Sequence, residues 1–380
     1  MFNTPILRLS TYTRLIRQHQ WLSVVLLTLF MGLISIILTG TTSTKAVASS
    51  ASSLKASANL RFNSYVSNYS RRFTTSSSHS SSSSNSASSA AFGHSSDGSS
   101  AVFKYNVAVA FQPKDRDENK LLKSKSKEEP SPTGEDNYFT FAKSDSELAC
   151  GVADGVGGWN ELGYDSSAIS RELCKALEKT YAKDNESKLS PKEMLSRAFK
   201  QIQEEKIVQV GGTTSCFGTF NADGRLSIAN LGDSWCGVFR QTKLIHETRI
   251  QTHQFNTPFQ LAIIPESILN QQKAGSRFIM DTPRKADEYS FQLQKGDIVV
   301  FATDGVIDNI AVQDIELYLD EQEGNPDFQE VASKFVKNVV NLSKDERFPS
   351  VFSQELSKLT GQFYSGGKED DITAVFVKVE

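Results

Sequence analysis

The stretch from Leu148 to Trp159, LACGVADGVGGW, restricts the fold most, because it changes from apolar residues to an aspartate and several glycines within a few positions. Its first half has the apolar content of a buried strand, and that strand ends at a single carboxylate, Asp154. Three glycines follow among the next four residues, so the backbone there can adopt φ > 0 and approach a ligand closely. Taken alone, the stretch is better interpreted as an ordinary strand-to-loop turn. Other acidic clusters in the chain change that interpretation.

Three further acidic clusters also lie at the ends of predicted strands: Glu135 with Asp136, Asp304 after the apolar run 298–303, and Asp370 with Asp371. If these ends gather at one edge of stacked sheets, four or more carboxylates share one site, and their repulsion requires cations. Carboxylate oxygens suit Mg²⁺ or Mn²⁺, and none of the five histidines lies in these motifs, which argues against zinc. Two such ions would activate a water molecule and hold a phosphoryl group. The chain has neither a P-loop nor a dinucleotide-binding fingerprint.

From Val102 onward, runs of β-branched and aromatic residues alternate with amphipathic helical patterns. Besides the strand that ends at Asp154, the predicted strands are 102–111, 138–141, 213–220, 225–231, 235–240, 288–293, 298–302 and 372–379. The predicted helices are 166–181, 191–209, 312–319, 328–340 and 351–359. Ser190 is the expected N-cap of the second helix, and a turn at 295–297 is expected to join a strand pair. Runs of strands separated by pairs of helices indicate an α+β layered fold.

The first hundred residues have a different composition. No Asp or Glu occurs before Asp97, and residues 1–20 are basic, which predicts a targeting segment. Residues 21–38 are 18 residues without a charge, close to the about 20 that span a bilayer as a helix, and predict an uncleaved transmembrane anchor. Serine makes up 15 of the 27 residues at 74–100, so we expect 39–101 to be a disordered tether before a globular domain at 102–380.

Two membranes are compatible with this N-terminal region. Enrichment in Arg, Ser and Thr without acidic residues is typical of a mitochondrial presequence, and the apolar segment would then stop in the inner membrane. The same segment would also act as a signal anchor for the endoplasmic reticulum and nuclear envelope. We favour the mitochondrial membrane, and the flanking charges do not orient the helix.

Composition limits the partners and the redox chemistry. The formal net charge of −3 over 380 residues argues against nucleic acid as a partner. The four cysteines have no CxxC or zinc-like spacing, so we expect small buried residues with free thiols: Cys150, Cys174, Cys216 and Cys236.

Six motifs occur in order along the globular part: GEDNYF near 134, GVADGVGGW near 151, GGTTSCFG near 211, NLGDSWCGVFR near 230, FATDGVIDNI near 301 and EDDITAVFV near 369. Together they resemble the motif set of the metal-dependent serine/threonine protein phosphatases of type 2C, most of all the fungal mitochondrial branch. The resemblance implies a four-layer α-β-β-α sandwich of two antiparallel sheets flanked by helices. It also implies a phosphoprotein substrate and two Mg²⁺ or Mn²⁺ ions in a cleft at one edge of the sandwich.

The resemblance also implies a role for each residue of the acidic motifs. Asp154 would bridge both ions and, with Asp304 and Asp370, form the catalytic set. The Gly155 carbonyl and Glu135 would bind the ion on one side. Asp304 and Asp370 would bind the ion on the other side.

Other motif residues would act around these ligands. Asp136 and Asp371 would lie next to the ligands without binding the ions directly. Asp308 would contribute to a third, weaker metal site. Gly232 and Asp233 would support the fold as part of a loop between strands.

Three positions depart from the family pattern. The histidine that often follows the second motif's Asp-Gly, a proposed general acid, is replaced by Val156. The arginine that holds the substrate phosphate, four residues before the acidic pair, is replaced by Ser131. The aspartate expected for a third metal ion is replaced by Gln209, which weakens that site.

Three functions are compatible with this pattern. An active phosphatase of phosphoserine and phosphothreonine is favoured, because every expected metal-binding carboxylate is present. A pseudophosphatase that serves as a binding module would explain the replaced histidine and arginine. A metal-dependent hydrolase of small phosphate esters would differ only in its substrate.

Overall fold

The structure, a computed structural model, describes residues 102–116, 131–185, 189–271 and 278–380. The predicted targeting segment, transmembrane anchor and tether, at 1–20, 21–38 and 39–101, lie outside these residues. Among the residues that are described, no helix is both long and apolar enough to cross a membrane.

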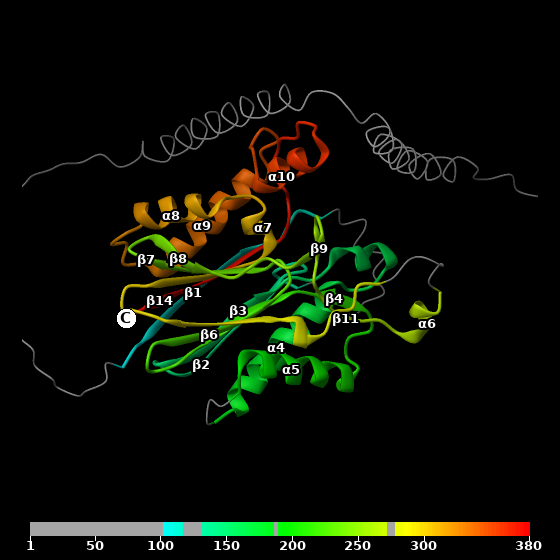
Figure 1. The fold of residues 1–380 in the computed structure, drawn as a ribbon, viewed down its shortest axis with the longest axis horizontal. Helices are drawn as coiled ribbons and strands as arrows, with labels where there is room; N and C mark the ends of the chain where they lie inside the picture. The colour runs from blue at the N-terminus through cyan, green and yellow to red at the C-terminus, as the bar shows by residue number, and fades with distance from the viewer. Residues whose placement is uncertain (1–101, 117–130, 186–188, 272–277) are drawn as a thin grey trace, which may run out of the picture. The chain divides into compact units, whose positions relative to one another are not determined.

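Most strands pair into two five-stranded antiparallel sheets (Figure 1). The first sheet contains, in spatial order, β1 (Tyr105–Gln112), β14 (Ile372–Val379), β13 (Ile298–Ala302), β7 (Trp235–Arg240) and β8 (Lys243–Glu247). The second contains β12 (Asp287–Gln292), β6 (Arg225–Leu231), β5 (Ser215–Phe220), β3 (Glu147–Ala153) and β2 (Asn137–Ser144). Two short ladders complete the strands: β9 (Thr252–Gln254) with β10 (Thr257–Pro258), and β4 (Gly211–Thr213) with β11 (Leu261–Ile263).

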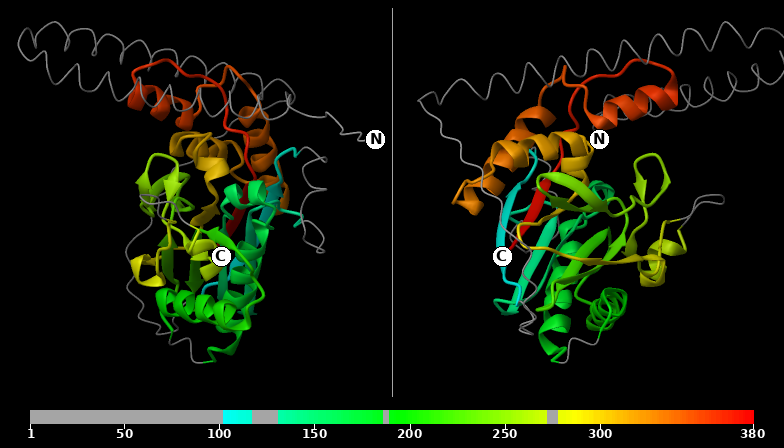
Figure 2. Two further views of the ribbon diagram at one scale, coloured as in Figure 1. Left: turned by 90° about the vertical axis from the view of Figure 1, so that its right-hand side faces the viewer. Right: turned by 60° about the vertical axis from the view of Figure 1, so that its left-hand side comes forward.

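Helices cover the outer face of each sheet, as Figures 1 and 2 show from three sides. The second sheet is covered by α4 (Ser167–Lys183) and α5 (Pro191–Glu205). The first is covered by α8 (Val312–Glu321) and α9 (Phe328–Ser343), and α10 (Val351–Thr360) follows them. Shorter helical segments are η2 (Gly157–Leu162), α6 (Glu266–Leu269), η3 (Pro283–Lys285) and α7 (Asp304–Ile307). The expected four-layer α-β-β-α sandwich of the α+β class is therefore confirmed.

Alternation along the strands divides the core into layers. In β3, Leu148, Cys150 and Val152 pack between the two sheets. Ala149 and Ala153, on the opposite face of the same strand, pack against α4 and α5. This period of two is the pattern of a strand with both faces buried, since successive side chains point to opposite sides. All four cysteines are buried and free, as the sequence predicts.

The helix at 191–205 begins as its sequence predicts. Ser190 accepts a hydrogen bond from the Glu193 backbone nitrogen, Glu193 bonds back to Ser190, and Pro191 occupies the first turn. This capping box satisfies backbone donors that the first turn would leave free. The helix ends at Glu205, four residues before the predicted end, because Lys206 adopts a left-handed conformation with φ 53°.

Two strand predictions are wrong in their pairing. Strands 288–293 and 298–302 do not pair with each other: β12 pairs with β6, whereas β13 pairs with β14 and β7. The turn between them carries the chain from one sheet to the other, which local turn residues cannot distinguish from a hairpin. The predicted strand 213–220 is divided between β4 and β5, which belong to different ladders. The short elements β8 to β11, α6 and α7 were not predicted.

The antiparallel registers bring the acidic strand ends together. Asn137 at the start of β2 pairs with Ala153 at the end of β3, so Glu135 and Asp136 lie beside Asp154. Ala302 at the end of β13 pairs with Ala374 of β14, which places Asp304 beside the residues that precede β14. An antiparallel pair joins the end of one strand to the start of its partner, and each pairing here uses that property.

We predict that Gly151→Ala destabilises the domain. An added Cβ would lie 2.2 Å from Cβ and 2.4 Å from Cα of Phe217, the residue paired with Gly151 across the sheet. Because backbone atoms must move, we expect the free energy of unfolding to fall by about 1–3 kcal/mol or more, measured by urea denaturation. Gly158→Ala is the control, since no atom lies within 4 Å of an added Cβ there. Equal stability of the two variants would contradict this account of the sheet.

Candidate metal centre

Two pairs of strands deliver the acidic residues to the same edge of the sandwich. Glu135 and Asp136 precede β2, and Asp154 follows β3. Asp304 is the first residue of α7 and is separated from the end of β13 by Thr303, and Asp370 and Asp371 precede β14. The fold therefore brings together all four acidic clusters that the sequence predicts.

The Asp154 backbone is held on both sides, whereas its carboxylate is not. Its nitrogen donates to Thr214 Oγ1 at 3.0 Å, and its carbonyl accepts from Thr214 N and Thr213 Oγ1, both at 2.9 Å. Within the described part of the chain, no hydrogen bond reaches its carboxylate. Burial, and next the negative charges of Asp304 and Asp136, raise the pKa of Asp154 well above its usual range. A cation bound beside Asp154 would favour its ionised carboxylate and so lower its pKa.

Glu135 is oriented from two directions. One carboxylate oxygen, Oε1, accepts hydrogen bonds from Ser166 Oγ at 2.6 Å and from Asn160 Nδ2. The other, Oε2, lies 3.0 Å from Lys114 Nζ and 3.1 Å from a guanidinium nitrogen of Arg116. Burial opposes ionisation, but these cations and the Ser166 hydroxyl outweigh it and lower the pKa of Glu135. The Glu135 side chain is therefore ionised and fixed in place.

Asp370 and Asp371 connect the same cations to the last strand. Lys114 Nζ lies 2.8 Å from Asp370 Oδ1, so one ammonium group lies between Glu135 and Asp370. Asp371 forms an ion pair with Arg116 and accepts from the backbone nitrogens of Glu135, at 2.7 Å, and Lys114, at 2.8 Å. Asp371 therefore holds together three segments that are distant in the sequence.

A third cation pairs with the remaining acidic residues. Lys368 Nζ lies 2.5 Å from Asp304 Oδ2, 2.5 Å from Asp308 Oδ2 and 3.4 Å from Asp370 Oδ2. Burial, and then the Asp304 carboxylate, raise the pKa of Asp308 to about 6, although Lys368 acts in the opposite direction. Asp233 is also buried in this group, and burial with the charges of Asp304 and Asp308 raises its pKa. Asp233 thus belongs to the acidic cluster and is more than a loop residue.

Asp136 lies beneath this cluster. It is 1% exposed, and its Oδ2 accepts from Thr303 Oγ1 at 2.8 Å, while its Oδ1 has no hydrogen-bond partner in the described structure. Burial, and next the charge of Asp371, raise the pKa of Asp136 well above its usual range. Thr303 also accepts from the Thr373 backbone nitrogen at 3.1 Å, which links β13 to β14.

The donor set fits hard divalent cations. It consists of carboxylate oxygens and one adjacent backbone carbonyl at Gly155, and such ligands suit Mg²⁺ and Mn²⁺. Gly155 must lack a side chain, because an added Cβ would lie 2.5 Å from Ser166 O and 2.6 Å from Glu135 O. No three His, Cys, Asp or Glu side chains in the described ranges already form a metal-binding shell, and Lys and Arg neutralise the carboxylates instead.

Comparison with known proteins identifies the family. The sequence profile described as Stage II sporulation protein E (SpoIIE) matches residues 144–380. The chain is 55% identical over 296 residues to "Protein phosphatase 2C homolog 7, mitochondrial" of Saccharomyces cerevisiae, a match that covers 76% of this chain and 86% of the relative. It is 34% identical over 251 residues to "Protein phosphatase PTC7 homolog fig" of Drosophila melanogaster, covering 65% of this chain and 77% of the relative.

The chain belongs to the type 2C protein phosphatases. It is thus a member of a family of metal-dependent serine/threonine phosphatases. Among solved structures, it is similar to that of the photosystem II phosphatase PBCP, with a TM-score of 0.57 and 26% identity. That match covers 73% of this chain and 99% of the other.

The three departures from the family pattern have clear locations. Val156 is partly buried, and its nitrogen donates to Gly212 O at 2.8 Å, so its apolar side chain takes the histidine position. Among the described residues, Ser131 bonds locally, to Thr133 Oγ1 at 2.9 Å and to the Gly134 nitrogen through its carbonyl. Gln209 is exposed between α5 and β4. No described hydrogen bond joins Gln209 to the acidic cluster.

Sequence reasoning missed the three cations Lys114, Arg116 and Lys368. Lys114 and Arg116 lie in the loop that follows β1, outside the six motifs. Lys368 stands two residues before Asp370, after two glycines, and this position next to an acidic motif was the available signal.

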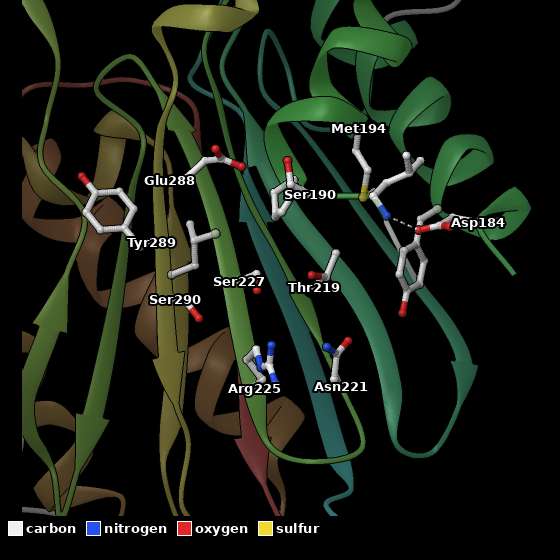
Figure 3. A pocket seen from close by; sticks show the side chains of 14 residues that line it. Asp184, Ser190, Met194, Thr219, Asn221, Arg225, Ser227, Glu288, Tyr289 and Ser290 are labelled. Atoms are coloured by element: carbon white, nitrogen blue, oxygen red, sulfur yellow. Dashed lines mark hydrogen bonds between the residues drawn. The ribbon is translucent and has the colours of Figure 1, made fainter. Parts of the chain in front are cut away.

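A separate cavity of about 360 Å³ lies between the start of α5 and strands β5, β6 and β12 (Figure 3). Met194, Ser227 and Ser290 are among its lining residues. None of the acidic residues described above lines it, so the cavity is distinct from the carboxylate cluster.

We predict that Thr303→Val destabilises the protein by about 1–3 kcal/mol, because it removes the hydroxyl that bonds a buried carboxylate and a backbone nitrogen. Valine has nearly the same shape, so packing is preserved. Chemical denaturation of the metal-free protein measures the change. Thr252→Val, at an exposed position of β9, is the matched control and should change little. A stability loss no larger than that of the control would mean that Asp136 does not depend on Thr303.

Proposed function

We propose that this phosphatase hydrolyses phosphoserine and phosphothreonine in proteins with a centre of two divalent ions, Mg²⁺ or Mn²⁺. The observation that carries this proposal is the strand register, which places Glu135, Asp154, Asp304 and Asp370 at one edge of the sandwich. So many carboxylates in one place are compatible with a folded chain only when cations neutralise them. Family membership supports the reaction and the metal dependence.

In this proposal Asp154 would bind both ions, because its carboxylate receives no hydrogen bond from the described residues and lies near enough to Asp304, Asp136 and Asp370 to be affected by their charges. Glu135 and the Gly155 carbonyl would hold one ion. Asp304 and Asp370 would hold the other. When bound, the ions supply a water nucleophile at neutral pH and neutralise phosphoryl charge.

The chain itself keeps these oxygens in position. Thr213 and Thr214 fix the Asp154 backbone, so its side chain leaves the strand end in one direction. Ser166 and Asn160 fix Glu135. Asp371 binds the Glu135 backbone directly and thereby ties the two halves of the centre together. Partners of this kind orient metal ligands and strengthen metal binding in proteins generally.

Lys114 and Arg116 take over the phosphate-binding role that the family arginine has at the Ser131 position. Both lie within 3.1 Å of Glu135, and their side chains are 29% and 21% exposed, so both face the edge of the cluster. Bound divalent ions would neutralise Glu135 and Asp370, which leaves the Lys114 ammonium free to bind a phosphate oxygen. Charge-assisted hydrogen bonds of this kind position phosphates strongly.

A mitochondrial location is proposed from the yeast relative, whose name states it. Anchoring through residues 21–38 remains a prediction from the sequence alone, since that segment lies outside the described residues. Within a mitochondrion, a phosphoprotein is the substrate class that the family assignment supports.

We predict that Asp154→Asn nearly abolishes Mn²⁺-dependent phosphate release from a phosphothreonine peptide. The substitution removes one negative charge from between two cations and so weakens both sites. Calorimetric titration should show reduced Mn²⁺ affinity, with Asp145→Asn as the exposed control. Equal affinity and equal turnover would overturn the two-ion centre. Faster release from an aryl phosphate than from the peptide by the unaltered protein would instead favour a small-ester hydrolase.

We predict that Lys114→Met raises the KM for the phosphopeptide about tenfold or more, because a charge-assisted hydrogen bond contributes about 1.5–3 kcal/mol. Inhibition by inorganic phosphate should weaken by a similar factor. Mn²⁺ affinity should stay equal or increase, since Lys114 pairs with Glu135 and Asp370. Lys104→Met is the control, because Lys104 is exposed and lies just before β1, the strand that Lys114 follows. An unchanged KM with weakened Mn²⁺ binding would show that Lys114 has only a structural role.

A further inference from the structure

Lys368 differs from the other lysines that the structure describes, because three carboxylates enclose its ammonium group. Its ammonium nitrogen lies 2.5 Å from Asp304, 2.5 Å from Asp308 and 3.4 Å from Asp370, and its side chain is only 15% exposed. Burying an ammonium group is costly unless acidic partners surround it. Here three partners do so, and their combined charge raises the pKa of Lys368 despite the opposing effect of burial.

The backbone of Lys368 is fixed by one buried side chain. Asn309 accepts a hydrogen bond from Lys368 N and donates one to Lys368 O, both at 2.8 Å. Asn309 also donates to Gly305 O at 2.8 Å and is 1% exposed. One carboxamide thus locks Lys368 to the segment that carries Asp304 and Asp308.

The residues before Lys368 are equally constrained. Gly366 has φ +116°, a conformation that L side chains rarely adopt. An added Cβ at Gly367 would lie 2.3 Å from Leu342 O and 2.4 Å from Ser343 Cα. Gly366 N also donates to Phe348 O at 2.8 Å. The loop therefore delivers Lys368 to one fixed place, and its ammonium group also lies 5.4 Å from the centre of the Phe352 ring.

The position that Lys368 occupies is acidic on several sides. Asp304 and Asp308 come from α7 and its end, Asp370 precedes β14, and Asp233 comes from the loop between β6 and β7. Asp233 Oδ1 is buried without a hydrogen-bond partner in the described structure. Gln209 stands where the family pattern has a further acidic ligand, and it is exposed and uncharged. The carboxylates near Asp308 thus create a strong negative potential that attracts a cation, although Gln209 supplies no further acidic ligand.

We propose that the Lys368 ammonium group is a tethered cation that takes the place of a third metal ion beside Asp304 and Asp308. The inference rests on the proposed two-ion centre. It predicts that the chain binds two divalent ions and that Asp308 serves to hold Lys368. Lys368 is a positioning residue in this proposal, because it acts through Asp304, which it keeps oriented toward the centre.

The test is a count of bound Mn²⁺ per chain, from the electron paramagnetic resonance signal of free Mn²⁺ during titration of the full-length protein. We expect two ions for the unaltered chain and for Lys368→Arg, and three for Lys368→Met, since removing the ammonium group frees Asp308. Lys344→Met is the control. Lys344 pairs with the exposed acids Asp115 and Glu369, so its replacement should leave the number of bound Mn²⁺ ions at two. A count of two for Lys368→Met would overturn the proposal.

A second variant keeps the test decisive if Lys368→Met fails to fold. Asp308→Asn should leave the count at two, because Asp308 holds a lysine and no metal ion. Loss of one ion in Asp308→Asn, or a count of three in the unaltered chain, would overturn the tethered-cation proposal while the two-ion centre stands. A count below two in the unaltered chain would instead contradict the two-ion centre itself.

Discussion

The mutual repulsion of carboxylates at one edge of the sandwich is the constraint on which the rest of this structure depends. Two unit charges 4 Å apart interact by about 4 kcal/mol at the effective dielectric constant of a protein surface. Several such pairs together rival the about 5–15 kcal/mol by which a domain is stable. The chain therefore needs cations at this edge, and Lys114, Arg116 and Lys368 supply them in the described structure.

Repulsion of this size is tolerated because the acidic residues are attached to the most rigid part of the fold. The registers Asn137 with Ala153 and Ala302 with Ala374 fix the strand ends within two sheets that pack on each other through a largely buried apolar layer. Packing between the sheets thus stabilises an arrangement that electrostatics alone would disperse. The same rigidity is what a metal-binding site requires, since ligands held by strands keep their geometry when the ions leave.

The sequence predicts this carboxylate edge well because its signals are regular. Continuous apolar runs stop just before Asp154 and Asp304, and antiparallel pairing then brings such strand ends together. The cations were not predictable in the same way, since a lysine in a loop has no periodic pattern and Lys368 is positioned by Asn309, 59 residues away. The crossing from β12 to β13 was missed for a related reason: a turn does not show which sheet the next strand joins.

The lysines at the centre differ in how firmly they are held, and this difference separates their roles. Lys114 spans Glu135 and Asp370, which belong to different ions in the proposed centre, and its side chain is 29% exposed. Divalent ions binding to those two carboxylates would compete directly with its ammonium group, and the exposed side chain has room to move toward a substrate. Lys368 is half as exposed, at 15%, and Asn309 fixes its backbone. Lys114 is therefore the more easily displaced of the two cations, and Lys368 is the more firmly held.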